Sequence, residues 1–330
     1  MHILAFLVLA ASVGTVSAQS PRVWRDPSPH TERFVAVESN VRLEVLDWGG
    51  SGRPVVLLAG GGNTAHVFDD FAPKLTARNH VYGITRRGFG RSGFSETATP
   101  SERLRDDVIA VISALKLDRP VLVGHSIGGF ELSAVASARP KRIAGLVYLE
   151  SAYPYAVSLP GGASIQDIFD NQPSPPTPAP SDLESFDSLR RWDARVFGFQ
   201  MPESEFHQIW ETDAMGRPLR PRDFSVGQIK LLVPVVMNGT RYSRIPSPAL
   251  IVFASPHTED GWVSDAPPER RGVMQAYFNT VNAATEKQAK AVEAAFPDAR
   301  VVRLRSSHYV FISNESDILR EMRAFLDRVK

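Results

Sequence analysis

The chain has 330 residues, of which 43% are hydrophobic and 22% are charged, a composition that is ordinary for a globular enzyme. Its 37 Lys and Arg residues nearly balance its 36 Asp and Glu residues, so a net charge of +1 gives no electrostatic reason to expect nucleic acid or an anionic membrane surface as a partner. The absence of cysteine excludes disulfides, thiolate metal sites and a cysteine nucleophile.

The first 18 residues have most features of a cleaved signal peptide. They contain no charged side chain, and a mostly apolar run covers residues 3–13. Small residues at Val16 and Ala18 then precede Gln19, as they do at signal-peptidase sites. The run is shorter than the roughly 20 apolar residues of a membrane-spanning helix. A basic segment before it is missing, which leaves a retained anchor or a buried N-terminal helix as alternatives. We expect cleavage after Ala18 and a secreted or periplasmic protein without a stable membrane anchor.

The pattern of apolar residues that follows predicts an α/β fold. A β-hairpin is expected over residues 33–48, with its turn at Ser39-Asn40. Short apolar runs then predict strands over residues 54–59, 81–85, 120–124, 143–149, 249–254 and 300–304. Amphipathic stretches predict helices over residues 64–78, 101–117, 127–138, 268–296 and 315–329. Because the strands are apolar on both faces and alternate with helices, we expect a mostly parallel sheet with helices on both faces.

Residues 153–245 interrupt this alternation. Residues 172–181 contain five prolines, which exclude a helix or a central strand, and short amphipathic pieces rich in aromatic residues follow. We therefore predict a signal peptide of residues 1–18 and one α/β core made of residues 19–152 and 246–330. A mainly helical cap, or lid, of residues 153–245 would be inserted into that core.

A possible nucleophile lies in Gly124-His125-Ser126-Ile127-Gly128, a G-x-S-x-G motif between a predicted strand and a predicted helix. Glycines at both ends of the motif let the strand and the helix approach closely. Ser126 can then occupy a strained turn with its hydroxyl exposed above the sheet. The alternative is a glycine-rich turn whose serine only caps the helix. We predict that Ser126 is a nucleophile.

A serine hydroxyl needs an adjacent base, and His308 is the candidate. It lies between the last predicted strand and the last predicted helix, where a loop projects from the carboxyl edge of the sheet. The chain order serine, acid, histidine that accompanies this motif selects it from eight histidines. The alternative is an ordinary polar loop residue.

Two places compete for the acid that would orient His308. Glu150 ends the predicted strand after the nucleophile helix, whereas Glu259 and Asp260 lie in the loop after the strand over residues 249–254. Both strands bring their carboxyl ends to the same edge of the sheet, so either carboxylate could reach the imidazole. The spacing favours Glu150, with Glu259 or Asp260 as the alternative.

The chain resembles the α/β-hydrolase fold superfamily over nearly all of its mature length except the predicted insertion. Besides the G-x-S-x-G motif, Leu57 to Gly62 with Phe68 downstream resembles the oxyanion loop of that superfamily. Arg87 to Gly93 resembles its R-G-x-G-x-S loop. The resemblance implies an oxyanion hole formed by the backbone N–H groups of Gly61 and Ile127.

The chain departs from the superfamily pattern at three positions. Ala59 replaces the usual histidine of the oxyanion loop, and His257 occupies the usual position of the acid. The ending Tyr148-Leu149-Glu150 instead resembles haloalkane dehalogenases, whose acid is a Glu after the preceding strand. The serine at the elbow argues, by resemblance, against dehalogenase and epoxide hydrolase activity, because those enzymes have Asp there.

These features together predict an exported serine hydrolase with a small-molecule, ester-like substrate. Ser126 would attack the carbonyl group, His308 would take and return the proton, and Glu150 would stabilise the imidazolium. Water would then hydrolyse the acyl-enzyme, and neither a metal nor an organic cofactor is expected. Lactonase, amidase or aminopeptidase, and acyltransferase activities are alternatives within the fold, as is a ligand receptor without significant turnover.

Overall fold

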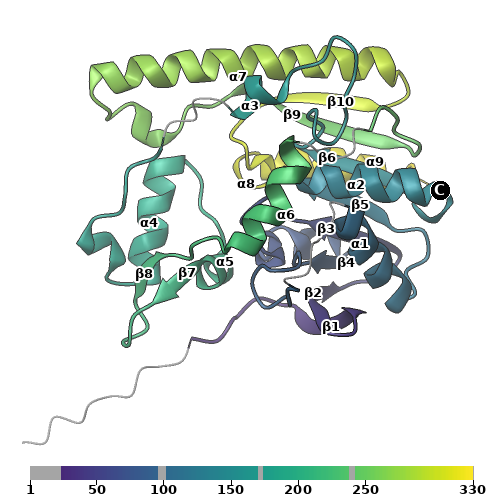
Figure 1. Cartoon of the computed structure of the whole chain (residues 1–330), viewed down its shortest axis with the longest axis horizontal. Helices are drawn as coiled ribbons and strands as arrows, with labels where there is room; N and C mark the ends of the chain where they lie inside the picture. Colours follow the sequence, from purple (N-terminus) through teal and green to yellow (C-terminus); the bar gives the residue numbers. More distant parts are fainter. Residues whose placement is uncertain (1–23, 96–101, 170–173, 238–241, 330) are drawn as a thin grey trace, which may run out of the picture.

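A computed structural model describes residues 24–95, 102–169, 174–237 and 242–329 (Figure 1). The predicted signal peptide, residues 1–18, lies outside the described residues. No helix in the described part is both long enough and apolar enough to cross a membrane.

A sheet of eight strands forms the centre of the molecule. The strands are β1 (Thr31–Glu38), β2 (Val41–Gly49), β3 (Arg53–Leu58), β4 (Asn79–Ile84), β5 (Val121–His125), β6 (Gly145–Leu149), β9 (Ala249–His257) and β10 (Arg300–Ser306). Their order in the sheet is β1-β2-β4-β3-β5-β6-β9-β10. The pairs β1/β2 and β2/β4 are antiparallel, whereas the pairs from β4 to β10 are parallel. The predicted hairpin and the predicted mostly parallel sheet are therefore confirmed.

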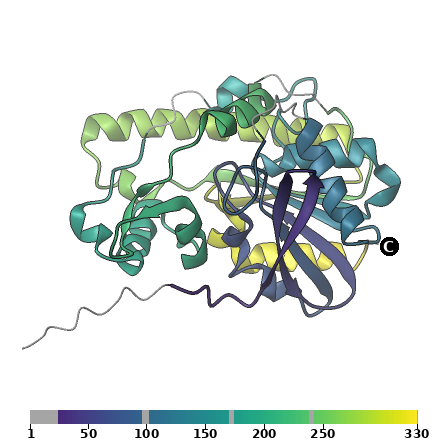
Figure 2. The ribbon, with the colours of Figure 1, turned by 60° about the horizontal axis from the view of Figure 1, so that its bottom comes forward.

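Helices and short 3-10 helices cover both faces of this sheet (Figures 1 and 2). The helices outside residues 153–245 are η1 (Ala65–Phe68), η2 (Ala72–Leu75), α1 (Glu102–Ala114), α2 (Gly128–Ala138), η3 (Pro140–Arg142), η5 (Gly261–Val263), α7 (Pro268–Ala295), α8 (Val310–Ser313) and α9 (Glu315–Leu326). Of these, η5 packs against α7 in a smaller cluster of its own and not on the sheet. One apolar core packs α1, α2 and the end of α7 on one face, and the other packs η1, η2, α8 and α9 on the opposite face.

Alternate residues of the central strands enter these two cores. In β3, Val56 and Leu58 belong to one core, and Val55 and Leu57 belong to the other. This two-sided burial explains why the central strands appear in the sequence as continuous apolar runs.

The predicted helix over residues 64–78 is wrong. Only two 3-10 helices, η1 and η2, form there, and Pro73 stands in the first turn of η2. Proline has no backbone N–H and its ring clashes with the preceding turn, so a continuous helix through Pro73 would be broken. Asp69 at the end of η1 instead faces the segment that precedes β1.

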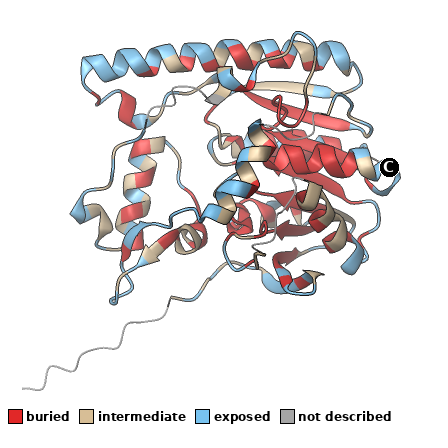
Figure 3. Cartoon of the chain, in the orientation of Figure 1, coloured by how far each residue is buried: buried red, intermediate tan, exposed pale blue. Residues whose placement is uncertain are grey.

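Residues 153–245 lie between β6 and β9. They contain α3 (Ile165–Phe169), η4 (Pro180–Leu183), α4 (Phe186–Phe197), α5 (Glu203–Ile209), β7 (Trp210–Thr212), β8 (Pro218–Pro221) and α6 (Val226–Met237). Helices prevail, but the antiparallel pair β7/β8 was not predicted. The helices α4 and α5 and this pair gather beside the sheet (Figure 1). Burial is concentrated in the sheet and α2, whereas much of α6 and β8 is exposed (Figure 3). The division into core and cap stays a prediction.

Candidate active site

The turn between β5 and α2 holds Ser126 in a strained conformation. Its φ angle is +51°, which is rare for a residue with a side chain. A Cβ atom at Gly124 would lie 2.7 Å from the carbonyl oxygen of Gly128, and one at Gly128 would lie 2.6 Å from that of Leu58. Only glycine fits at either position, so the motif forms the sharp turn that the sequence predicts.

Ser126 lines a cavity of about 370 Å³. Glu150, His308, His257 and Asp260 line the same cavity. The apolar part of its wall comes from Tyr153, Tyr155, Ile168, Phe197, Phe199, Met201, Tyr277, Phe278 and Val281. The structure thus brings the predicted nucleophile, base and acid to one cavity, together with one of the two alternative acids.

The Glu150 carboxylate is fully buried at the end of β6 and accepts three hydrogen bonds. Its Oε1 accepts from the Tyr153 hydroxyl and lies 3.0 Å from Nε2 of His257, and its Oε2 accepts from the backbone N–H of Ala254. Its φ angle of +51° is strained like that of Ser126. Glu150 thus combines a strained backbone with a buried, fully hydrogen-bonded carboxylate. This combination is typical of a functional site.

The two alternative acids differ in their surroundings. Glu259 is exposed and does not line the cavity. Asp260 does line it, and burial raises the pKa of Asp260 to about 6. Asp260 is therefore the alternative that the structure leaves near Ser126.

His257 is held as a hydrogen-bond donor at both ring nitrogens. The oxygen of the Asn282 side-chain amide accepts the backbone N–H of His257 at 2.7 Å, which orients the amide, and Nδ1 lies 3.3 Å from that oxygen. The other nitrogen, Nε2, faces Glu150. Burial opposes a charged ring, but Glu150 and Asn282 raise the pKa of His257. A ring that donates from both nitrogens has no lone pair free, so His257 cannot act as a base in this arrangement.

The His308 ring is free to accept a proton. Its backbone carbonyl accepts from Nε2 of His125 at 3.0 Å, but the ring itself makes no hydrogen bond within the described part of the chain. Burial and the neighbouring His125 and His257 rings lower the pKa of His308 to about 3, although Glu150 opposes this change. The ring is therefore neutral. No hydrogen bond among described residues joins it to Ser126 or Glu150, and such contacts often tighten only when substrate binds.

Tyr155 is a residue of the cavity that no sequence pattern indicated. Its hydroxyl shares a hydrogen bond with the Ser126 side chain, and the residue is 2% exposed. Burial and the nearby Glu150 charge raise the pKa of Tyr155, so the phenol stays neutral. The contact joins Ser126, before β6, to Tyr155, after it. In the sequence, only the position of Tyr155 shortly after Glu150 could have suggested this contact.

The predicted oxyanion loop lies against the elbow. A Cβ atom at Gly60 would lie 3.2 Å from Cβ of Ser126, and one at Gly61 would lie 3.8 Å from Cγ2 of Ile127. Buried Arg86 donates to the carbonyl oxygens of Ala59, at 2.7 Å, and Gly60, at 3.0 Å. These bonds hold the loop carbonyls, and Arg86 is itself paired with buried Glu131.

The far end of this loop is held by α5. Oε1 of Glu205 accepts from the Asn63 amide, at 2.9 Å, and from the Thr64 backbone N–H, at 3.0 Å. Ser204 donates to Oδ2 of Asp69 at 2.6 Å. Burial raises the pKa of Glu205 to about 7, although its Thr64 and Asn63 partners oppose this change. No pattern in the sequence predicted these contacts, because α5 and the loop are distant in the chain.

The family model described as the alpha/beta hydrolase family matches residues 55–321. The chain belongs to this family. Among known relatives, the chain is 31% identical over 142 residues to the AB hydrolase superfamily protein YisY of Bacillus subtilis, a match that covers 42% of this chain and 53% of that protein. It is 25% identical over 226 residues to a pyrethroid hydrolase of Sphingobium wenxiniae, covering 60% of this chain and 78% of the relative.

A solved structure has the same fold. E-2-(acetamidomethylene)succinate hydrolase superposes with a TM-score of 0.59 at 18% identity, covering 90% of this chain and 99% of that one. At this identity, the likeness concerns the fold alone. The chain spans about half or less of the first curated relatives, 53% of one and 29% of the next, so its activity and substrate are matters for proposal.

Proposed function

We propose that this hydrolase is an exported serine esterase that cleaves an ester-like substrate through an acyl-enzyme. The observation that carries the proposal is the strained Ser126 in a cavity that Glu150 and His308 also line. A neutral imidazole, a buried carboxylate and a serine at a sharp turn are the three groups that nucleophilic acyl transfer requires.

The proposed reaction proceeds in two halves. His308 accepts the Ser126 hydroxyl proton while Oγ attacks the ester carbonyl, and the backbone N–H groups of Gly61 and Ile127 stabilise the oxyanion. The tetrahedral intermediate collapses when His308 gives that proton to the leaving alcohol. Water, deprotonated by His308, then attacks the acyl-enzyme and releases the acid. Glu150 stabilises the imidazolium in both halves.

Two further side chains support these groups in the proposal. Tyr155 holds the Ser126 hydroxyl before substrate binds and keeps its own proton. His257 positions Glu150 through the contact at Nε2, and Asn282 holds His257 in turn. His257 would thus fill, as a positioning residue, the place where the superfamily usually has its acid.

The cavity wall supports a class of substrate. Its described residues include aromatic and aliphatic side chains but no Lys or Arg, and the His257 ring is already engaged by Glu150 and Asn282, so no free cationic side chain of the described wall would face a carboxylate on the substrate. We therefore propose a neutral ester with an apolar or aromatic group. The relative named pyrethroid hydrolase agrees with an ester of this kind.

The test combines covalent labelling with a substrate panel of p-nitrophenyl esters, lactones and aminoacyl amides. Ser126→Ala should abolish both fluorophosphonate labelling and ester turnover, a loss on the order of a millionfold in rate, with Tm nearly unchanged because the lost hydroxyl adds little packing. Retained turnover in purified Ser126→Ala would refute the proposal. Labelling of the parent without turnover of any substrate would favour a receptor. Selective turnover of lactones or amides would identify the protein as a lactonase or an amidase and would refute the esterase activity.

Export and cleavage after Ala18 belong to the same proposal. Mass spectrometry of the protein purified from its natural source should find Gln19 at the amino terminus. A mature protein that begins at Met1 would contradict this part of the proposal and leave the chemistry untouched.

A further inference from the structure

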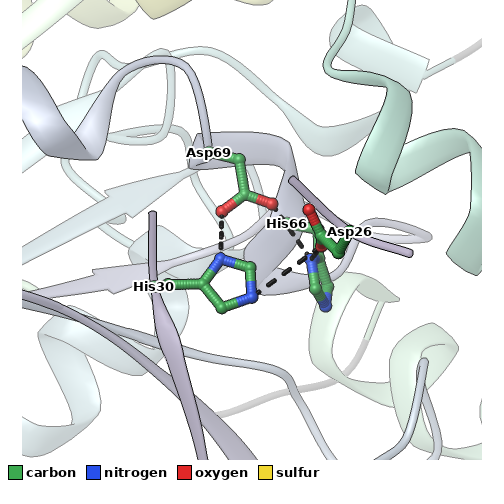
Figure 4. Close-up of side chains that lie close together, drawn as sticks. All are labelled: Asp26, His30, His66 and Asp69. Carbon is green, nitrogen blue, oxygen red and sulfur yellow. Dashed lines mark hydrogen bonds and ion pairs between the residues drawn. The ribbon is translucent and has the colours of Figure 1, made fainter. Parts of the chain in front are cut away.

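A second group of titratable side chains lies away from the catalytic cavity (Figure 4). Asp26 and His30 come from the segment that precedes β1, and His66 and Asp69 come from η1 and the residue after it. None of the four lines the cavity that contains Ser126. We infer that these four residues form a binding site for a divalent transition-metal ion, with Zn²⁺ as the ion that fits best.

The geometry supports four ligands around one ion. One ligand atom from each residue lies within 4.8 Å of the others. Nδ1 of His66 lies 3.0 Å from Oδ2 of Asp69 and 3.2 Å from Oδ2 of Asp26, and Nε2 of His30 lies 3.8 Å from the same Asp26 oxygen. Neighbouring ligands of tetrahedral zinc are separated by about 3.3 Å, because zinc binds N and O at about 2.0 Å. An ion can therefore enter after small side-chain movements.

One buried acceptor in the cluster lacks a partner, and a nearby ring nitrogen makes no hydrogen bond among the described residues. Oδ2 of Asp26 is buried without a well-formed hydrogen bond, and the nearby His66 Nδ1 hydrogen already bonds Asp69. The His30 side chain is 4% exposed, and its Nδ1 bonds Oδ1 of Asp69 at 2.8 Å. Its Nε2 is left facing Asp26 with no hydrogen bond among described residues. A cation between these two atoms would satisfy both lone pairs.

Charge and outer contacts also suit a divalent ion. Two aspartates and two neutral histidines carry a charge of −2, so Zn²⁺ would make the buried group neutral. Asp69 orients His30 through Nδ1, and buried Glu44 lies 3.8 Å from the other nitrogen, Nε2, of His66. The Asp69 contact is of the kind that fixes the ring of a metal-binding histidine, whereas Glu44 is too far from Nε2 of His66 to hydrogen-bond it. Imidazole ligands favour zinc over calcium or magnesium, which prefer oxygen.

Without an ion, a proton takes its place at His66. Burial opposes a charged ring, but Asp26, Asp69 and Glu44 raise the pKa of His66 to about 12. The metal must displace this proton, so a purely protonic network is the competing arrangement that the experiment has to exclude.

A metal ion at this site would cross-link segments that are distant in the sequence, in a chain that has no disulfide. It joins the segment before β1 to η1, and Ser204 of α5 donates to the same Asp69 oxygen. From the sequence, neither a metal nor an organic cofactor was expected for the proposed chemistry, and the four residues of this cluster match no short metal-ligand motif. This proposal replaces that expectation with a structural site that takes no part in ester cleavage.

The test measures Zn²⁺ binding in the tag-free chain after removal of metals with a chelator. We expect one Zn²⁺ per chain, and a Tm that rises by about 4 °C when free Zn²⁺ is 100 times its Kd. Asp26→Asn and His30→Gln should each weaken binding by more than about 100-fold and abolish that rise. Co²⁺ in the parent should give the visible absorption of a four-coordinate site, and neither variant should show it.

His80→Gln is the matched control. His80 forms a similar pair with Asp47, at 2.7 Å, outside the cluster, so this variant should keep the full response to Zn²⁺. Each variant is compared with itself in the presence and absence of Zn²⁺, so a loss of stability from the substitution alone does not enter the result. No Zn²⁺ response in the parent, or a response that survives in Asp26→Asn and His30→Gln, would overturn the inference.

Discussion

Glu150→Gln tests the proposed acid with a change of one atom. The glutamine amide has one acceptor atom and one donor group, whereas Glu150 accepts at both oxygens. The backbone N–H of Ala254 requires the amide oxygen, so the amide N–H₂ group must face Tyr153 and His257. The tyrosine hydroxyl can rotate to accept, but His257 must lose the proton on Nε2.

Two effects of different size follow from this exchange. Leaving a buried donor poorly paired costs about 1 to 3 kcal/mol of stability, or about 1.5 to 4.5 °C in Tm for a chain of this length. Loss of the charge that stabilises the His308 imidazolium should lower kcat by about 10³ to 10⁴, equivalent to about 4 to 5.5 kcal/mol in the barrier. The variant should therefore remain folded at 25 °C while being nearly inactive.

The assay is kcat and KM for a p-nitrophenyl ester, with Tm measured on the same preparation. Glu259→Gln makes the same chemical change at an exposed residue and should stay within about tenfold of the parent, as should Asp260→Asn. An active Glu150→Gln enzyme beside a nearly inactive Asp260→Asn enzyme would refute the reasoning and place the acid in the loop after β9.

Three further outcomes are expected. Tyr155→Phe removes one hydrogen bond to Ser126 and should lower kcat/KM by about 2- to 13-fold; an unchanged value would remove Tyr155 from the site. The His308 pKa of about 3 predicts that kcat/KM in brief assays stays level from pH 8 to 5, because the base remains neutral, and a fall centred near pH 6.5 would contradict this. Burial raises the pKa of Asp193 from 3.8 to about 7, so its contribution to stability is complete below pH 3.8 and lost as pH rises through 7. Asp193→Asn cannot ionise and should exceed the parent in stability at pH 8, by up to about 4 kcal/mol, but not at pH 4; parallel curves of Tm against pH would show that folding does not raise the pKa of Asp193.

The parts of the fold that could be predicted best are the strands that are buried on both faces of the sheet. The central strands are apolar on both faces, so runs such as residues 54–59 stand out in the sequence, and the glycines of the elbow mark the turn that contains Ser126. The helix over residues 64–78 was predicted from its apolar spacing, and Pro73 overrode that spacing. The pair β7/β8 is short and largely exposed, so its sequence lacks the alternation of apolar and polar residues that would predict strands.

The candidate site was predictable only where chain order or a motif constrains it. Ser126 and His308 follow from position relative to strands, and the structure brings both to one cavity with Glu150. The contacts of Tyr155 with Ser126, of Asn282 with His257 and of Arg86 with the glycine loop depend on how distant segments pack. No periodicity encodes such contacts, because each joins residues that lie on different elements.

The buried bonds of α5 restrict how a substrate could enter. Ser204 and Glu205 fasten the start of α5 to Asp69 and to the loop at Asn63 and Thr64, so moving α5 would strip several buried donors of their acceptor at once. The start of α5 is therefore the fixed end of any opening motion of residues 153–245. Any widening of the cavity would then come from its walls at Ile168 of α3 and Phe197 of α4, and hydrogen exchange should find the amides of α5 slow beside faster ones in α3.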